Sequence, residues 1–287
     1  MPLERWDTAL PPDSAFWTVC REQALLLGGP AAAVLQIADP EVAQGVARYS
    51  DFERDAWGRL VRTLEAVWTI GFGPRVEAEA LKERLIAGHA RFRIQRADTG
   101  EAGSGLDPDL QLWVLATLIM GSLEGYVRIH GAAPDALKAS FYRDMRLFGS
   151  YFGLDPAYGP PDWPAFASWY AERLRDSRLG SDPASRRIAW GVARPPRPLW
   201  LRWAMRPFRY LLAEGLPTPV NERLGFPSTG WSRWQMATTD RLVRWLVPWL
   251  PAVFRYPAPY RRAVKRHGWR VTRKGIAPAK ARFNTVV

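Results

Sequence analysis

Apolar residues recur with helical spacing along nearly the whole chain of 287 residues. Residues on one face of an α-helix recur every three or four positions, whereas a half-buried strand alternates apolar and polar side chains. Alternating stretches are rare here, and none is paired with a hairpin turn signal. Because 47% of the residues are apolar, the chain can bury a full-sized core. The sequence therefore predicts an all-α fold, a single globular multi-helix domain.

Capping residues and breakers divide the chain into expected helices. Asp107 and Pro108 are a typical N-cap and first-turn pair, and they predict a long central helix that runs to about Ile129. A glycine-rich loop is expected before it, at 99–105. The other expected helices are 20–27 (stopped by Gly28, Gly29 and Pro30), 31–38, 40–46, 55–71, 76–95, 138–152 and 163–177. Residues 1–268 are expected to form the one domain, and residues 269–287 a basic, flexible C-terminal tail.

Several classes of site are excluded by composition and motifs. Cys20 is the only cysteine, so the chain has no internal disulfide, no cysteine-rich metal site and no C-x-x-C-H for covalent haem attachment. It also lacks a nucleophile elbow, a P-loop and an H-E-x-x-H zinc motif. The first residues carry Glu4 and Asp7 and no long apolar run, unlike a secretory signal. We expect a cytoplasmic protein.

Positive charge is concentrated in the last third of the chain. The net charge is +12, yet after Arg186 the only acids are Glu214, Glu222 and Asp240. Many of the fifteen tryptophans lie among the arginines of this region. Basic residues with tryptophan suit the inner face of an anionic membrane better than a base-reading groove, so peripheral membrane contact is one option and no nucleic-acid partner is expected. The other option is that these tryptophans fill the core while the arginines face water.

No membrane-spanning helix is convincing from the sequence. The most apolar stretch, 110–123, is short and contains Gln111, Thr117 and Ser122, which suits a buried central helix.

His89 stands in an apolar stripe of the helix expected at 76–95. Leu81, Leu85, His89 and Phe92 share one helical face. A neutral imidazole that points inward, with no acidic partner one turn away, is an arrangement that binds a metal or a haem iron. Gly88 leaves the backbone bare, so a flat macrocycle could approach. A core histidine without a ligand is the alternative from these residues alone.

Six segments occur in an order typical of one known family. They are Leu25-Leu26-Leu27-Gly28-Gly29-Pro30, Leu35-Gln36-Ile37-Ala38-Asp39-Pro40, Tyr49-Ser50-Asp51-Phe52, Gly58-Arg59-Leu60-Val61-Arg62-Thr63, Gly88-His89-Ala90-Arg91 and 106–117, which reads LDPDLQLWVLAT. With weaker similarity to about His267, this series resembles the MpaB-like oxygenase family, whose best-known distant relative is the rubber oxygenase called latex clearing protein.

The resemblance implies an all-helical domain enclosing a haem b pocket. It makes His89, with Gly88 beside it, the site of iron binding, and it places Arg59 and Thr63 next to the haem, with Arg62 flanking. The implied reaction is oxidation of a hydrophobic small molecule with O₂ or peroxide. His130, which ends the central helix, is the second choice for the iron ligand. The alternative function is a non-catalytic helical protein at the membrane surface with a decayed haem site.

Three positions depart from the family pattern. The family often has histidine where Asp39 stands, and again where Leu115 stands. The rubber-cleaving relative has a lysine able to cap iron at the position of Arg62, and arginine does not coordinate iron at neutral pH. The departures put hydrogen bonds at the haem, and even haem binding itself, in doubt.

Overall fold

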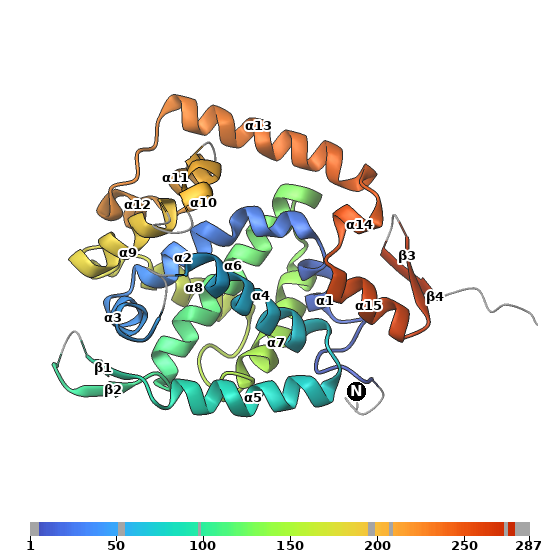
Figure 1. Cartoon of the computed structure of the whole chain (residues 1–287), viewed down its shortest axis with the longest axis horizontal. Coiled ribbons are helices and arrows are strands. Elements are labelled where there is room, and N and C mark those ends of the chain that lie inside the picture. The colour runs from blue at the N-terminus through green and yellow to red at the C-terminus, as the bar shows by residue number, and fades with distance from the viewer. Residues whose placement is uncertain are drawn as a thin grey trace, which may run out of the picture.

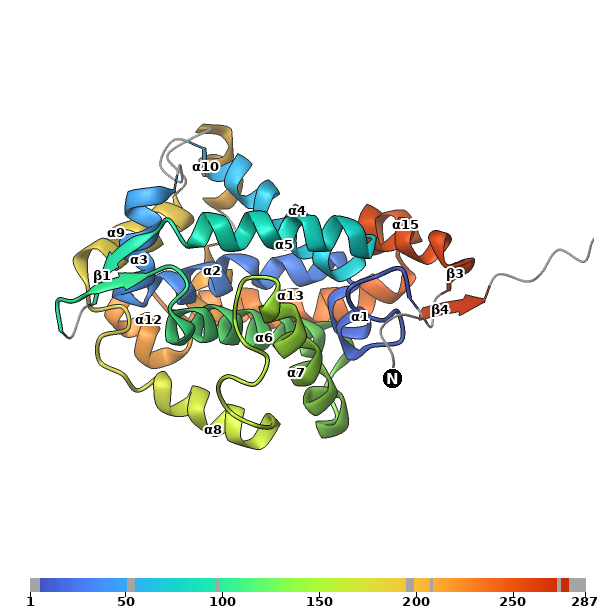
Figure 2. The same ribbon diagram turned by 90° about the horizontal axis from the view of Figure 1, so that it is seen from below.

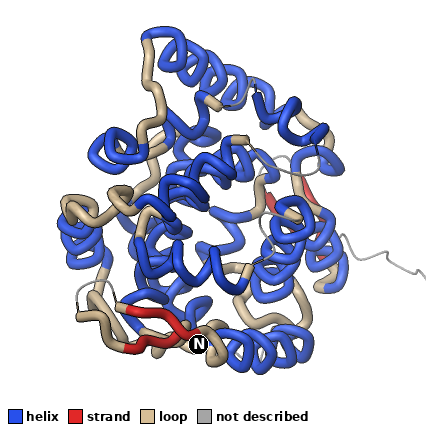
Figure 3. The backbone as a smooth tube through the Cα atoms, turned by 60° about the vertical axis from the view of Figure 1, so that its left-hand side comes forward, coloured by secondary structure: helices blue, strands red, loops and turns tan. Residues whose placement is uncertain are grey.

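The computed structural model describes residues 6–50, 55–96, 99–194, 199–206, 209–272 and 275–278. Helices make up almost all of the regular structure, and only two short pairs of strands accompany them (Figures 1 and 3). The all-α fold expected from the helical periodicity is confirmed.

The helices are α1 (Ala15–Cys20), the 3-10 helix η2 (Gln23–Gly28), α2 (Gly29–Ile37), α3 (Pro40–Tyr49), α4 (Ala56–Phe72), α5 (Arg75–His89), α6 (Pro108–His130), α7 (Asp135–Ser150), α8 (Trp163–Arg173), α9 (Pro183–Ala193), α10 (Leu199–Met205), α11 (Tyr210–Gly215), α12 (Thr218–Leu224), α13 (Gly230–Leu246), the 3-10 helix η5 (Val247–Trp249), α14 (Ala252–Arg255) and α15 (Ala258–Arg266). The strands are β1 (Arg93–Gln95), β2 (Ala102–Ser104), β3 (Trp269–Thr272) and β4 (Gly275–Pro278).

Helix α6 is the centre of the core. The Asp107 carboxylate accepts a hydrogen bond from the backbone N–H of Asp109 at 3.0 Å, which starts the helix as its capping sequence predicts. Helices η2, α2, α7 and α13 pack around it, as Figure 2 shows for the three α-helices. Trp113 donates its indole N–H to the Gln36 carbonyl at 3.2 Å. Within the described residues, α6 alone is long and apolar enough to cross a membrane, but its neighbours cover much of it.

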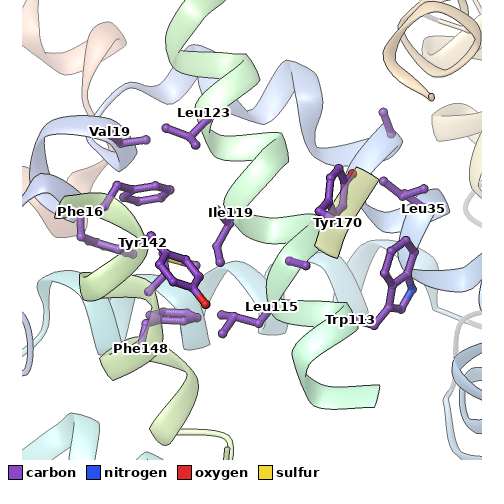
Figure 4. Close-up of a cluster of buried hydrophobic side chains, with 14 of the residues drawn as sticks. Phe16, Val19, Leu35, Trp113, Leu115, Ile119, Leu123, Tyr142, Phe148 and Tyr170 are labelled. Atoms are coloured by element: carbon purple, nitrogen blue, oxygen red, sulfur yellow. The ribbon is translucent and has the colours of Figure 1, made fainter. Parts of the chain in front are cut away.

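Four phenylalanines join α1, α4 and α7 at one end of the core. Phe16 lies against Phe72, Phe141 and Phe148, with ring centroids 5.6–6.4 Å apart. Phe16 and Phe148 appear among the buried side chains in Figure 4. Gly71 gives Phe16 its space, because a Cβ built at Gly71 would lie 2.3 Å from the Phe16 ring. A ring held on several sides cannot move away from an added methyl group.

Gly71→Ala is therefore expected to destabilise the protein by about 1–3 kcal/mol through overpacking. Urea unfolding measures this as a lower midpoint with an unchanged slope. Gly88→Ala is the matched control, since Gly88 is also helical and a Cβ there meets no atom within 4 Å. Equal midpoints for the two variants would contradict the packing seen around Phe16.

The segment after His89 differs from expectation. The helix expected to continue to Gln95 ends at His89, and Phe92 lies beyond it. Residues 93–95 form β1, which pairs antiparallel with β2 inside the loop expected at 99–105. Only the central residue of β1, Ile94, is buried, and it faces Gly103 across the pair. Three residues are too few to show a strand period in the sequence.

Other boundaries also shift. Gly28, Gly29 and Pro30, expected to stop a helix, connect η2 to α2, with Pro30 in the first turn of α2, where its missing N–H costs nothing. The helix expected at 20–27 is a 3-10 helix, and those expected at 138–152 and 163–177 run from 135 to 150 and from 163 to 173. In the C-terminal region, β3 pairs with β4, and the Trp269 ring packs against Trp6 at 5.5 Å.

Candidate functional site

Helices α4 and α5 form a hairpin that carries most of the predicted site residues. Gly73 and Pro74 connect them, and the two helices pack against each other. Arg59 lies near the start of α4, and His89 is the last residue of α5, so both stand at the open end of the hairpin. Figure 1 shows the two helices close together at the turn and diverging toward that end.

His89 has one ring nitrogen engaged and one without a hydrogen-bond partner among the described residues. Its Nδ1 lies 2.7 Å from the Leu85 carbonyl oxygen. Because a carbonyl only accepts, Nδ1 carries the proton, and Nε2 of the neutral ring keeps its lone pair. A histidine that ligates a metal typically has its other nitrogen fixed in this way. Leu81 and Leu85, on the same face, pack against the core, while His89 itself is half-buried.

The surface of α5 at Gly88, the residue before His89, is open. A Cβ built at Gly88 meets no atom within 4 Å, although the residue is only half exposed. The His89 ring lies 5.4 Å from Phe92 and 6.3 Å from Phe152 between centroids. The imidazole is therefore bordered by aromatic side chains, with open volume beside its preceding residue.

Arg59 is a partly buried cation without a carboxylate partner in the described structure. Its Nη1 donates to the Ser50 hydroxyl at 2.7 Å. Burial lowers the pKa of Arg59, and the nearby charge of Arg62 lowers it further. A guanidinium nevertheless stays charged at neutral pH, so this group is suited to binding an anion such as a carboxylate. The sequence analysis named Tyr49-Ser50 only as a family segment and missed the role of Ser50 in holding Arg59.

Thr63 and Arg62 make contacts that need no ligand. The Thr63 hydroxyl donates to the Arg59 carbonyl at 2.9 Å, a bond common for threonine inside helices. Arg62 forms an exposed ion pair with Asp55 at 3.3 Å, and both side chains are at least half accessible. Of the α4 residues expected at the haem, Arg59 alone has its charged group partly buried and unpaired by an acid.

The apolar stripe of α4 is only partly covered. Trp57 is 44% exposed and Leu60 is 46% exposed, whereas Ile70 and Phe72, near the end of the same helix, are buried. The later part of the helix also packs against the core through Val67 and Trp68. Among the described residues, Trp200 of α10 touches Trp57 edge-on at 5.8 Å. The open end of the hairpin thus exposes apolar side chains, on a different face of α4 from Arg59.

Asp39 and Leu115 replace histidines of the family pattern with structural contacts. One carboxylate oxygen of Asp39 caps α3 by accepting from the backbone N–H of Glu41 and Val42, and the other lies 2.6 Å from Arg173. Burial raises the pKa of Asp39, although these donors act in the opposite direction. Leu115 is buried in the core and packs against Gly149. Neither position offers a group to iron.

His130 belongs to a buried charge cluster that the sequence analysis did not identify. Its Nε2 lies 3.3 Å from the Glu22 carboxylate, which Arg255 also binds through two nitrogens at 2.7 and 2.9 Å. Burial alone would raise the pKa of Glu22, but the hydrogen bonds from His130 and Arg255 lower it below its usual value. His130 thus faces a carboxylate, while His267 packs among Trp6, Trp17 and Trp269. Glu22 and Arg255 are 233 residues apart, so no local sequence pattern could predict that they pair.

Comparison with known proteins identifies the family to which the chain is similar. Residues 17–249 match the model of the family described as "ER-bound oxygenase mpaB/B'/Rubber oxygenase, catalytic domain". Two mycobacterial relatives, the uncharacterized proteins Mb2261 of Mycobacterium bovis and Rv2237 of Mycobacterium tuberculosis, are each 26% identical over 221 residues, covering 75% of this chain and 82% of theirs. No solved structure gives a significant match. Because the family model spans most of the chain, the protein belongs to the mpaB and rubber oxygenase family.

Proposed function

We propose that the protein is a haem b-dependent oxygenase that oxidises a hydrophobic small molecule with O₂ or peroxide. The observation that carries the proposal is the state of His89, whose Nδ1 is committed to the Leu85 carbonyl while Nε2 has no described partner. In this tautomer Nε2 keeps the lone pair that would bind iron. Membership in an oxygenase family supports the reaction class.

The residues present fit the group in three respects. His89 would hold the iron, Gly88 would let the macrocycle lie close to the helix, and Arg59 would bind a propionate carboxylate. The Ser50 hydroxyl accepts a hydrogen bond from Arg59 and would help to hold this guanidinium in place. Haem supplies the reactivity with oxygen when bound, and the protein supplies binding, orientation and exclusion of water.

The apolar side chains at the open end of the hairpin would receive the substrate. Trp57, Leu60 and Trp200 expose much of their surface there, and the burial of apolar surface is the main force that binds a hydrophobic molecule. Arg62 is held by Asp55 on the exposed side of α4, so we give it no direct part. The Thr63 hydroxyl would donate a hydrogen bond to a ligand only after it turns away from the Arg59 carbonyl.

A visible spectrum of the purified protein tests the proposal. The haem form absorbs intensely in the Soret region, and a pyridine haemochrome assay identifies the porphyrin as haem b. If the protein is isolated colourless, titration with haemin should give a saturable Soret band with one site per chain. No such band under either condition would favour the second candidate, a non-catalytic family member, which the structural uses of Asp39 and Leu115 support.

Gly88→Ala separates a haem site from an empty surface. With nothing within 4 Å of the added methyl group, the variant should be at least as stable as the natural protein, because alanine favours helix by up to about 1 kcal/mol. A porphyrin lying against Gly88 would clash with that methyl group, so haemin affinity should fall about tenfold, or by roughly 1.4 kcal/mol. Haemin titration and thermal unfolding are measured on the same samples. Unchanged haemin affinity would place the macrocycle elsewhere.

A further inference from the structure

Helix α13 carries a row of exposed aromatic residues. Trp231, Trp234, Leu242 and Trp245 are spaced by three, eight and three positions, which puts them on one face of α13, and Trp249 follows in η5. Each side chain is between 54% and 70% exposed. We call these five residues the aromatic ridge. In Figure 1, α13 lies along the upper edge of the molecule, opposite α5.

The ridge faces outward because the other side of α13 is bound to the protein. Ser232, Met236 and Val247 are buried, and the helix packs on α6 and α11. Asp240 forms an ion pair with Arg128 of α6 at 3.7 Å. Thr229 and Ser232 close a capping box at the helix start. The helix is therefore anchored, and exposure of the ridge is not a consequence of loose packing.

Further apolar surface continues beyond the helix. Leu246 is exposed beside Trp245, and Val253 and Phe254 of α14 follow the last ridge residue, with exposures of 50% and 67%. Soluble monomers rarely expose large contiguous apolar patches unless something binds there. So many exposed side chains in a single stretch of chain indicate a surface that is covered in use.

Arginines flank the ridge on one side. Arg233, Arg241 and Arg244 are exposed on α13, and none forms an ion pair with a described acidic residue. Arg233 and Arg244 reach only the Ser228 hydroxyl and the Val127 carbonyl, both at 3.4 Å. Of the three acids after Arg186, Asp240 binds Arg128, Glu214 accepts from the Ser228 and Ser232 hydroxyls, and Glu222 lies on α12. This side of α13 is therefore uniformly positive.

Indole, aliphatic and positively charged side chains occur together on this surface, and an anionic lipid membrane is the partner that suits all three. Indole rings are favoured at the level of lipid headgroups, and arginines bind lipid phosphates. Leu242, Val253 and Phe254 gain from contact with acyl chains and would gain little from a nucleic-acid backbone. A second copy packed ridge to ridge with its α13 antiparallel would bring the arginine rows of both chains together. We propose that the aromatic ridge and its arginine flank seat the protein on an anionic phospholipid membrane, with α13 lying along the membrane plane.

The proposal does not depend on haem, because no residue of the ridge belongs to the α4–α5 site. Sedimentation with vesicles of phosphatidylcholine containing phosphatidylglycerol is expected to bring down the natural protein, and added salt is expected to release it. Phosphatidylcholine vesicles alone should bind it much less. Brominated lipids should quench the tryptophan emission of the vesicle-bound protein, because the ridge indoles reach the acyl-chain boundary.

Two sets of variants test the surface. Arg233→Gln with Arg241→Gln and Arg244→Gln should weaken partitioning on the order of 100-fold, about fivefold for each charge. Trp234→Gln with Trp245→Gln removes two of the four ridge indoles and should therefore lower the lipid quenching by about half. The charge-matched control replaces Arg84, Arg143 and Arg175, which are exposed on α5, α7 and just after α8, and should bind as the natural protein does.

Several results would overturn the proposal. They are an equal loss for the control triple variant, an absence of vesicle binding by the natural protein, and a dimer that the tryptophan variants convert to monomers. Salt-sensitive binding to DNA that exceeds binding to vesicles, and that the same arginine changes abolish, would assign the surface to nucleic acid instead. Circular dichroism of each variant checks the fold. A colourless protein that still binds vesicles would refute the haem proposal alone.

Discussion

His89→Ala is expected to abolish the Soret band of the protein, or to lower its haemin affinity by at least 100-fold. The imidazole Nε2 is the group that we propose binds iron, and its removal leaves the Leu85 carbonyl and the rings of Phe92 and Phe152 nearby. None of these coordinates iron well. The fold should survive, because His89 is half-buried and its one hydrogen bond contributes about 1 kcal/mol. Absorbance of matched samples measures the loss.

Two controls make the His89 result specific. His130→Gln should keep the Soret band, since the His130 ring faces Glu22 and Tyr126 in a separate cluster. His89→Gly with added imidazole should regain a band, because the free ring can enter the space that the side chain left. Retention of haem by His89→Ala together with its loss in His130→Gln would exchange the two ligand assignments.

The core and its helices were largely predictable because their signals are local. Asp55 and Asp107 each precede an apolar periodic segment, and both accept hydrogen bonds from backbone N–H groups at the starts of α4 and α6. The expected starts of these two helices are confirmed. What failed was the end of α5, because strands of three residues are too short to show a strand period. There β1 pairs with β2 instead of extending the helix to Gln95.

The candidate site was predictable only in part. Spacing placed Arg59 and His89 on successive helices, and the α4–α5 hairpin puts both at its open end. The same periodicity could not show that Trp57 and Leu60 stay exposed, or which tryptophans of the basic region point outward. A row of tryptophans has the same sequence pattern whether it packs in the core or lies exposed on the outside of the protein. Only the packing of Met236 and Val247 decides the orientation of α13.

The substitution Glu22→Gln is expected to cost about 3–5 kcal/mol of unfolding free energy, because it leaves a buried guanidinium without its counter-charge. The Glu22 side chain is inaccessible to solvent, and that of Arg255 is 4% exposed. Three contacts join the carboxylate to Arg255 and His130, so one change breaks the whole cluster. For a chain of this size the melting temperature should fall on the order of 10 °C. Calorimetry or thermal circular dichroism measures the shift.

The double variant Glu22→Met with Arg255→Met isolates the charge effect. Removing both charges leaves no buried ion, so it should recover much of the stability lost in Glu22→Gln. A loss equal to or larger than the sum of the single changes would instead mean that shape, not charge, dominates.

The pH dependence gives an independent check. The pKa of Glu22 is lowered in the folded protein, so its stabilising contribution is fully present at neutral pH and is lost as pH falls through the lowered pKa. The natural protein should therefore lose more stability than Glu22→Gln when urea unfolding is repeated below about pH 4. If both proteins lose the same unfolding free energy at low pH, protonation of the Glu22 carboxylate does not cause the acid destabilisation. The cluster would then owe its stability to packing around Tyr126 and Tyr256.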